Sequence, residues 1–270
     1  MRKIITLFLM QTAIFAVSAE TGSVSYELEI NNVLITETNK DDVLSDGGSV
    51  KYNPDTRCLL LTDADIQYIG SMDYGGYTFF SGDLEINLAG NSSIESKDYF
   101  AIELPIYSSN LIITGSGSLR VETQSSNHCA IFCKSLTIKD TQVEINTPNY
   151  YTIGGDYGNS IAFTADHSHI RLTAGKEGAV QLHRFEMLNS EITSPRGAEW
   201  DSHSMAFVDF NSPIAAGTTI EIQPVGSGLE DIMSAGFPNG HARKVYDPET
   251  GNIYILLGGK AYNLQGRVVK

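Results

Sequence analysis

Short stretches of alternating apolar and polar residues recur along the middle of the chain. Each stretch opens on a large apolar residue, repeats an apolar residue two positions later, passes through a turn residue and a small residue, and closes on an apolar residue. A period of two residues is typical of β-strands. Six copies occur, at residues 59–66, 84–94, 111–119, 136–143, 163–170 and 185–192. Each copy predicts two short strands joined by a tight corner.

The copies follow one another at a nearly constant spacing. Their first apolar residues are separated by 25, 27, 25, 27 and 22 residues, and glycine-containing turns lengthen two copies. In a β-helix each coil repeats the path of the last about 4.8 Å further along the axis, so equivalent residues stack. Hairpin sandwiches have variable loops instead, and the signature residues of leucine-rich repeats and propellers are missing. The predicted fold is therefore all-β, a right-handed single-stranded parallel β-helix (a solenoid) with atypical capping ends.

Stacking of the copies predicts two ladders of side chains at the corner. Small and polar residues suit this place because the backbone bends sharply there. The turn residues form the first ladder, which consists of Asp63, Asp140, His167 and Asn189. The residues that follow them form the second, which consists of Ala64, Thr141, Ser168 and Ser190. A further strand of each coil is predicted at residues 101–104, 130–133 and 179–182.

Both ends of the chain depart from the repeat. A positive start, an apolar stretch at residues 4–17 and a small-residue site ending at Ala19 are typical of a secretory signal peptide. A solenoid also needs caps, because bare terminal coils expose strand edges and core. Three parts are predicted: a signal peptide at 1–19, a β-helix with an N-terminal cap at 20–228, and a C-terminal β-hairpin or tail at 229–270. We expect a secreted protein, extracellular or at the cell surface, with the periplasm as an alternative and no membrane insertion after cleavage.

The net charge limits the classes of partner, and the cysteine spacing limits which disulfides can form. The chain carries 18 Lys and Arg against 32 Asp and Glu, and removal of the signal peptide leaves 16 against 32. So acidic a surface repels nucleic acid and favours a soluble monomer. Cys58, Cys129 and Cys133 show no paired spacing. Because Cys129 and Cys133 lie about 13 Å apart along one strand, they are too distant to bridge each other, and buried thiols are expected.

Two motifs resemble a known family. Residues 26–66 contain DVLSDGGSVKYNPDTRCLLLTDADI, and a later rung reads ITGSGSL, ending at Leu119. They resemble exported, pectate-lyase-like β-helix proteins of Bacteroidetes that bind carbohydrate. The resemblance implies binding of cellulose and acidic sugars with calcium, without an established general enzyme activity. It assigns no calcium ligands here, so the metal-binding residues are unknown. The ending YNLQGRVVK is similar to the short endings of exported Bacteroidetes proteins.

The chain offers scattered candidates for catalysis and metal binding. A lyase needs carboxylates that hold calcium and a base that removes a proton. Candidate carboxylates are Asp63, Asp65, Asp140, Asp156 and Asp166, and candidate bases are Lys134, Lys139, Arg171 and Arg184. His167, His169 and His183 are the best candidates for a transition metal, although hydrogen-bonded surface histidines are the simpler interpretation. No spacing brings these groups to one catalytic face, so an enzyme is the less favoured hypothesis.

Aromatic side chains in turns supply the strongest indication of a ligand. Flat aromatic faces stack on sugar rings while nearby amides and carboxylates accept hydroxyl groups. The predicted carbohydrate-binding residues are Tyr74, Tyr77, Tyr99, Tyr150, Tyr151 and Tyr157. We therefore expect a protein that binds polysaccharide or another glycan along a lateral face of the β-helix, with calcium as a candidate cofactor. The alternatives are a polysaccharide lyase or hydrolase, and an adhesin-like structural surface protein.

Overall fold

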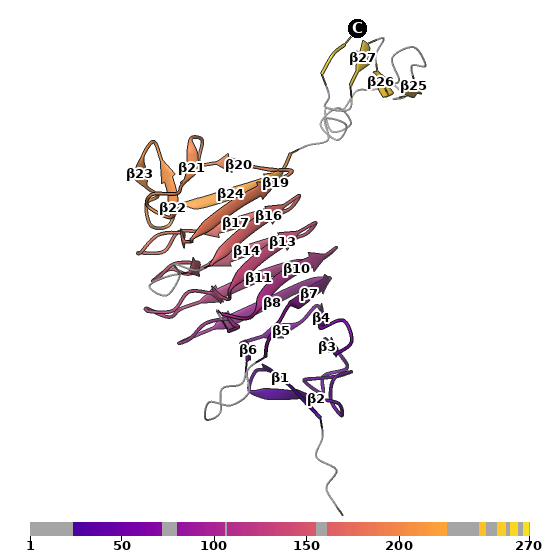
Figure 1. Cartoon of the computed structure of the whole chain (residues 1–270), viewed down its shortest axis with the longest axis vertical. Helices are drawn as coiled ribbons and strands as arrows, with labels where there is room; N and C mark the ends of the chain where they lie inside the picture. The colour runs from indigo at the N-terminus through magenta and orange to yellow at the C-terminus, as the bar shows by residue number, and fades with distance from the viewer. Residues whose placement is uncertain are drawn as a thin grey trace, which may run out of the picture.

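The computed structural model describes residues 24–71, 80–105, 107–154, 161–225, 243–246, 253–257, 260–263 and 267–269. Within these ranges every regular element is a β-strand, and the strands stack into a parallel β-helix (Figure 1). The predicted fold class is thereby confirmed. The predicted signal peptide at residues 1–19 lies outside the described residues. None of the described residues forms a helix of the length and apolarity that a membrane span requires.

Three sheets run along the solenoid, and the chain visits them in turn in each coil. Sheet 1 contains β3 (Val50–Asn53), β4 (Cys58–Thr62), β7 (Leu84–Ala89), β10 (Asn110–Gly115), β13 (Ser135–Lys139), β16 (Ala162–Asp166) and β19 (Arg184–Leu188). Sheet 2 contains β5 (Asp65–Ile66), β8 (Asn91–Ser96), β11 (Ser118–Thr123), β14 (Gln142–Asn146), β17 (His169–Thr173), β24 (Thr219–Pro224) and β20 (Ser190–Ser194). Sheet 3 contains β1 (Ser25–Ile30), β2 (Val33–Thr36), β6 (Ile69–Ser71), β9 (Ile102–Glu103), β12 (Ile131–Phe132), β15 (Ile153–Gly154) and β18 (Val180–Gln181).

The core is built from stacked apolar side chains. In sheet 1, Leu84, Leu111, Leu136 and Phe163 pair in register on successive strands, and all four are fully buried. The strand pleat turns every second side chain inward, so the alternation in the sequence becomes one continuous core. One prediction of register is wrong: Leu59 pairs with Ile86 rather than Leu84. This shift of two residues keeps the same face inward.

Antiparallel strands close both ends of the solenoid. At the first coil, β3 pairs antiparallel with β4 and β1 pairs antiparallel with β6. At the last coil, β24 inserts antiparallel between β17 and β20. The sequence predicted that residues around Ile192 would continue the parallel stack, and this is wrong. Ile220 and Ile222 of β24 are fully buried and cover the core beside β17 instead.

Six further strands form two small antiparallel sheets. The first contains β21 (Ala198–Asp201), β22 (Ala206–Asp209) and β23 (Ser212–Pro213). Phe207 of β22 is buried and its ring lies 4.9 Å from that of Phe185, so this sheet also covers the core. The second contains β25 (Arg243–Tyr246), β26 (Ile253–Leu257) and β27 (Lys260–Tyr262).

The predicted corner between sheets 1 and 2 has the expected geometry. Asp63, Asp140, His167 and Asn189 have φ of 49°, 50°, 45° and 50°, which is the left-handed region. Asp, Asn and His are the non-glycine residues most enriched there. In the second coil Gly90 turns the corner, with φ of 75°, and a Cβ at this position would lie 2.2 Å from Oδ1 of Asp63. The positive φ favours glycine at this position, because L side chains rarely adopt it, whereas the exposed Asp63 side chain could move aside.

Candidate functional site

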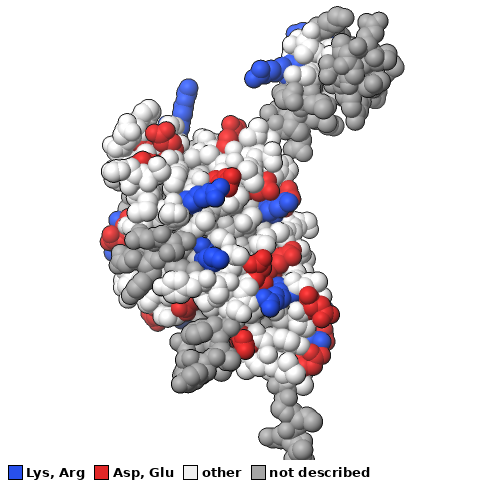
Figure 2. Space-filling view, in the orientation of Figure 1, with Lys and Arg blue, Asp and Glu red and all other residues white. Residues whose placement is uncertain are grey.

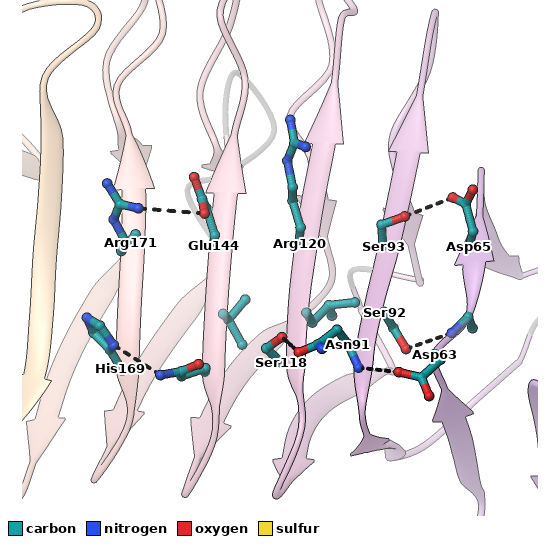
Figure 3. Close-up of a pocket in the computed structure, with 14 residues that line it drawn as sticks. Asp63, Asp65, Asn91, Ser92, Ser93, Ser118, Arg120, Glu144, His169 and Arg171 are labelled. Atoms are coloured by element: carbon teal, nitrogen blue, oxygen red, sulfur yellow. Dashed lines mark hydrogen bonds and ion pairs between the residues drawn. The ribbon is translucent and has the colours of Figure 1, made fainter.

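A groove of about 610 Å³ follows the outer surface of sheet 2 (Figure 3). It crosses β5, β8, β11, β14 and β17, so it extends over four strand spacings, or about 19 Å at the usual separation of about 4.8 Å. Between the two outward positions on each of the five strands lies a residue whose side chain is buried: these residues are Ala64, Ser92, Leu119, Val143 and Ile170. The backbone of these residues forms the floor, and outward side chains on either side form two parallel rows.

The first row lies beside the corner. It consists of Asp63, Asn91, Ser118, Gln142 and His169. The backbone amide of Asn91 donates to Asp63 Oδ1 at 2.8 Å, and Ser118 Oγ donates to Asn91 Oδ1 at 2.8 Å. Gln142 Nε2 and His169 Nδ1 lie 3.4 Å apart. Neighbouring coils thus hold each other's side chains in fixed positions, while these groups stay open to solvent.

The second row lies two residues further along each strand. It consists of Asp65, Ser93, Arg120, Glu144 and Arg171. Ser93 Oγ donates to Asp65 Oδ1 at 2.8 Å. Arg171 lies between Glu144 at 3.8 Å and Glu221 at 3.4 Å. This row therefore presents both donors and acceptors along the solenoid axis.

The charges of the groove are largely balanced. Arg120 contacts Glu95 at 3.5 Å and also hydrogen-bonds Glu122, and the second contact raises the pKa of its guanidinium. Because Arg120 and Arg171 each have two carboxylates within reach, neither presents an uncompensated positive charge. Figure 2 shows the same mixture of signs over the viewed face of the solenoid, where blue and red groups lie side by side. The groove is suited to hydroxyl groups more than to anions.

The predicted tyrosines are only partly brought together. Tyr74, Tyr77 and Tyr157 lie outside the described residues. Tyr99 follows β8 and is 45% exposed, and its ring lies 4.5 Å from that of His128 on the next coil. Tyr150 and Tyr151 contact each other at 5.2 Å on a later coil. Counting back from the paired residues Ile102, Ile131 and Ile153 places Tyr99, His128 and Tyr150 at equivalent positions of successive coils.

The described carboxylates proposed for a lyase fall at two separate places, with Asp63 and Asp65 at one and Asp140 and Asp166 at the other. Asp63 and Asp65 are at one end of the groove, and Arg171 is at the other. Asp140 Oδ1 lies 2.9 Å from His167 Nδ1, and Asp166 lies 3.9 Å from Lys139. Arg184 pairs with Glu186, and Asp156 lies outside the described residues. The described candidates therefore form separate surface pairs rather than a catalytic cluster.

The described residues include no group of three or more His, Cys, Asp or Glu side chains that could hold a metal ion. In the DGGS turn, Asp42 and Asp46 accept the backbone amides of the turn itself, with Gly48 N 3.0 Å from Asp42 Oδ1 and 3.1 Å from Asp46 Oδ1. These hydrogen bonds explain the motif by turn geometry. His167 and His169 contact Asp140 and Gln142 respectively, so they do not converge on one ion. The described residues thus show no side-chain cluster of this kind, and calcium stays a prediction.

The sequence contained a signal for the groove that its strand pattern alone did not single out. Three successive coils place a polar–apolar–polar triplet directly after the corner, at residues 118–120, 142–144 and 169–171. The apolar residue of each triplet is buried, so the flanking polar residues must face solvent together. Stacked coils then align these residues into rows.

Comparison of the chain with protein-family models, with curated proteins and with solved structures finds no match. The resemblance to carbohydrate-binding β-helix proteins thus stays a prediction from the two motifs. The groove and the described tyrosines, Tyr99, Tyr150 and Tyr151, have to be interpreted from their own chemistry.

Proposed function

We propose that the protein is a secreted or cell-surface protein that binds a linear, uncharged polysaccharide along the groove of sheet 2. The observation that supports this most is the repetition: five adjacent strands each present two outward polar side chains at a constant spacing. A linear polymer repeats its hydroxyl groups along one axis, so it matches a surface whose donors and acceptors repeat along one axis. Affinity then arises from several weak contacts in series.

The charge distribution supports an uncharged ligand. An anionic polysaccharide needs unpaired cations, whereas Arg120 and Arg171 are each held by two carboxylates. The whole chain is also acidic, with a formal net charge of −14. Long-range repulsion therefore opposes a polyanion before it reaches the groove. Hydroxyl groups carry no such penalty. The Asn, Ser and Gln side chains of the rows can both donate to them and accept from them, and the Asp carboxylates can accept from them.

The test compares two matched pairs of substitutions in the full chain. Asn91→Ala with Gln142→Ala removes two amides from the first row of the groove. Asn110→Ala with Thr137→Ala removes polar groups from the outer surface of sheet 1, where Asn110 accepts Ser135 Oγ at 2.7 Å much as Asn91 accepts Ser118. Binding to a panel of neutral and acidic polysaccharides is measured by retention on the polymer and by titration, with and without EDTA. An assay for unsaturated product runs in parallel.

We expect a neutral polysaccharide to bind, and the groove variant to lose about tenfold to hundredfold in affinity. Two hydrogen bonds of about 1 kcal/mol each correspond to a loss within this range. The sheet 1 variant should bind as the wild type does. The absence of any polysaccharide binding, or equal losses in both variants, would refute the proposal. Formation of unsaturated product would favour a lyase, and loss of binding in EDTA would show that calcium takes part.

A further inference from the structure

A second hollow lies between the N-terminal cap and the second coil. Its volume is about 540 Å³, and we name it the corner pocket. Its lining combines aromatic rings with amides and carboxylates from both parts, including Glu29, Asn32, Gln67, Tyr68, Asp98 and Tyr99. The corner pocket and the groove share no lining residue. It needs its own explanation, because the proposed function uses only the groove.

Tyr68 forms a fixed wall of the corner pocket. Its hydroxyl donates to Glu103 Oε2 at 3.1 Å, and its ring lies over Gly70, where a Cβ would come within 1.9 Å of the Tyr68 oxygen. Asn31 Oδ1 accepts the backbone amides of Gln67 and Tyr68 at 2.7 and 3.1 Å. The wall is thus held by the cap on one side and by the next coil on the other. A preorganised wall lowers the cost of binding a small ligand.

Tyr99 supplies an aromatic surface that solvent can reach. Behind the ring lie Phe100 at 4.9 Å and His128 at 4.5 Å, and Thr123 Oγ1 donates to the Tyr99 carbonyl. Burial lowers the pKa of His128, so this neighbour is uncharged at neutral pH. Tyr99 as a whole is 45% exposed, although its ring is braced by these neighbours and lies 6.4 Å from the ring of Tyr68. A large aromatic surface that is both rigid and exposed is the kind of platform on which the C–H face of a sugar stacks.

Polar groups around the platform match hydroxyl groups. Gln67 and Asn32 provide exposed amides, and Asp98 provides an exposed carboxylate next to Tyr99 in the chain. Glu29 is partly buried, and burial raises the pKa of its carboxyl group. Amides and carboxylates that surround an apolar platform can fix the orientation of a sugar ring. The two carboxylates outnumber the single cation, Lys97, so an anionic sugar is disfavoured.

We propose that the corner pocket binds one uncharged sugar residue at the end of a glycan chain, stacked on Tyr99. This inference rests on the proposed function for its class of ligand, since both sites would bind neutral carbohydrate. The division of tasks is new. The groove contacts the length of a chain, whereas the lining of the corner pocket is confined to the cap and the first two coils, so the pocket has room for a chain end only.

The experiment uses short ligands, which fill the corner pocket but only a fraction of the groove. Full-length protein is titrated with neutral disaccharides (cellobiose, mannobiose, xylobiose and lactose) and with digalacturonate. Tyr99→Ser removes the platform, and Tyr107→Ser is its control, because Tyr107 is 88% exposed and lies outside the lining of the corner pocket. The groove variant with Asn91→Ala and Gln142→Ala is titrated in parallel. Gln67→Ala is a second pocket variant in case Tyr99→Ser lowers the thermal stability.

We expect at least one neutral disaccharide to saturate the wild type, with digalacturonate at least tenfold weaker. Tyr99→Ser should weaken disaccharide binding tenfold or more and Gln67→Ala several-fold, while Tyr107→Ser and the groove variant keep it. Failure of every neutral disaccharide to saturate, or unchanged binding in both pocket variants, would overturn the inference. If polysaccharide binding depends on the groove and disaccharides do not bind, only the corner pocket is refuted. If disaccharides bind at Tyr99 and the groove variant binds polysaccharide normally, only the groove proposal fails.

Discussion

Replacement of Phe163 by Ala should cost about 3–5 kcal/mol of unfolding free energy, the usual range for a buried phenylalanine. Phe163 is fully buried, and it stacks in register between Leu136 and Phe185 of the adjacent coils. Its ring lies 5.2 Å from the ring of Phe185, which in turn contacts Phe207 of the C-terminal cap. The backbone on both sides is fixed by ladder hydrogen bonds, so the coils cannot collapse into the cavity. We therefore expect a value in the upper part of the range.

The assay is urea denaturation followed by two probes. Circular dichroism reports the whole solenoid. Fluorescence reports the last coils, because Trp200 is the single tryptophan and lies 6.4 Å from Phe185. Phe210→Ala is the control: its side chain is 79% exposed, and a change of no more than about 0.5 kcal/mol is expected. If Phe163→Ala lowers the midpoint no more than Phe210→Ala does, with unchanged slopes, the packing argument is refuted.

Three further predictions concern buried polar and ionisable groups. Ser168→Ala should cost about 1–3 kcal/mol of unfolding free energy, because the buried hydroxyl donates to Asp166 O at 2.8 Å and accepts from Thr141 N at 3.3 Å. Ser190→Ala, at the partly exposed equivalent position, should cost clearly less in the same denaturation assay. Equal costs for the two variants would contradict the reasoning. Burial raises the pKa of Glu29 above its unfolded value, so the contribution of this group to stability is present at low pH and lost as pH rises through the folded pKa. Glu29→Gln should therefore gain stability relative to the wild type between pH 4 and pH 7. A difference in unfolding free energy that stays constant over this range would count against the pKa shift. Burial also raises the pKa of the Cys133 thiol to about 12 and raises that of the Cys129 thiol further. A thiol reagent at pH 8 should therefore label the partly exposed Cys58 first and the other two cysteines only after unfolding. Peptide mapping of the labelled protein measures this order.

The repeat could be predicted because the local apolar pattern and the stacking of the coils both require the same residues to face the core. Leu111, Leu136 and Phe163 were aligned from spacing alone, and the structure pairs them. The tight corner at Asp140 and His167 was likewise predicted, since four of the six copies place Asp, His or Asn there, and these residue types tolerate the left-handed backbone that the structure shows. Three of the seven strands of sheet 3 were predicted from the apolar alternation around Ile102, Ile131 and Val180.

What the repeat could not show lies where strands from distant parts of the chain meet. Strand β24 pairs antiparallel with β17, and the paired residues are 46 to 52 positions apart, from Thr173 with Thr219 to Ile170 with Ile222, so no periodic pattern marks such a pairing. The groove was missed for a different reason. The outward polar residue of a strand has the same local pattern whether it serves solubility or binding, and only the alignment of Ser118, Gln142 and His169 on successive coils makes a row. The corner pocket joins Glu29 to Tyr99, two residues whose proximity depends on how the cap folds back.

The parallel register of sheet 2 ties the length of the groove to the number of coils. Every added coil would extend both rows of the groove by one strand spacing, about 4.8 Å, without altering the coils already present. Length of ligand and number of coils are therefore coupled one to one. Duplication or loss of a single coil would change which chain lengths are held most tightly, while the chemistry of each contact stayed the same. In such an architecture, the preference for long over short polymers changes with the number of coils and needs no substitution in the groove.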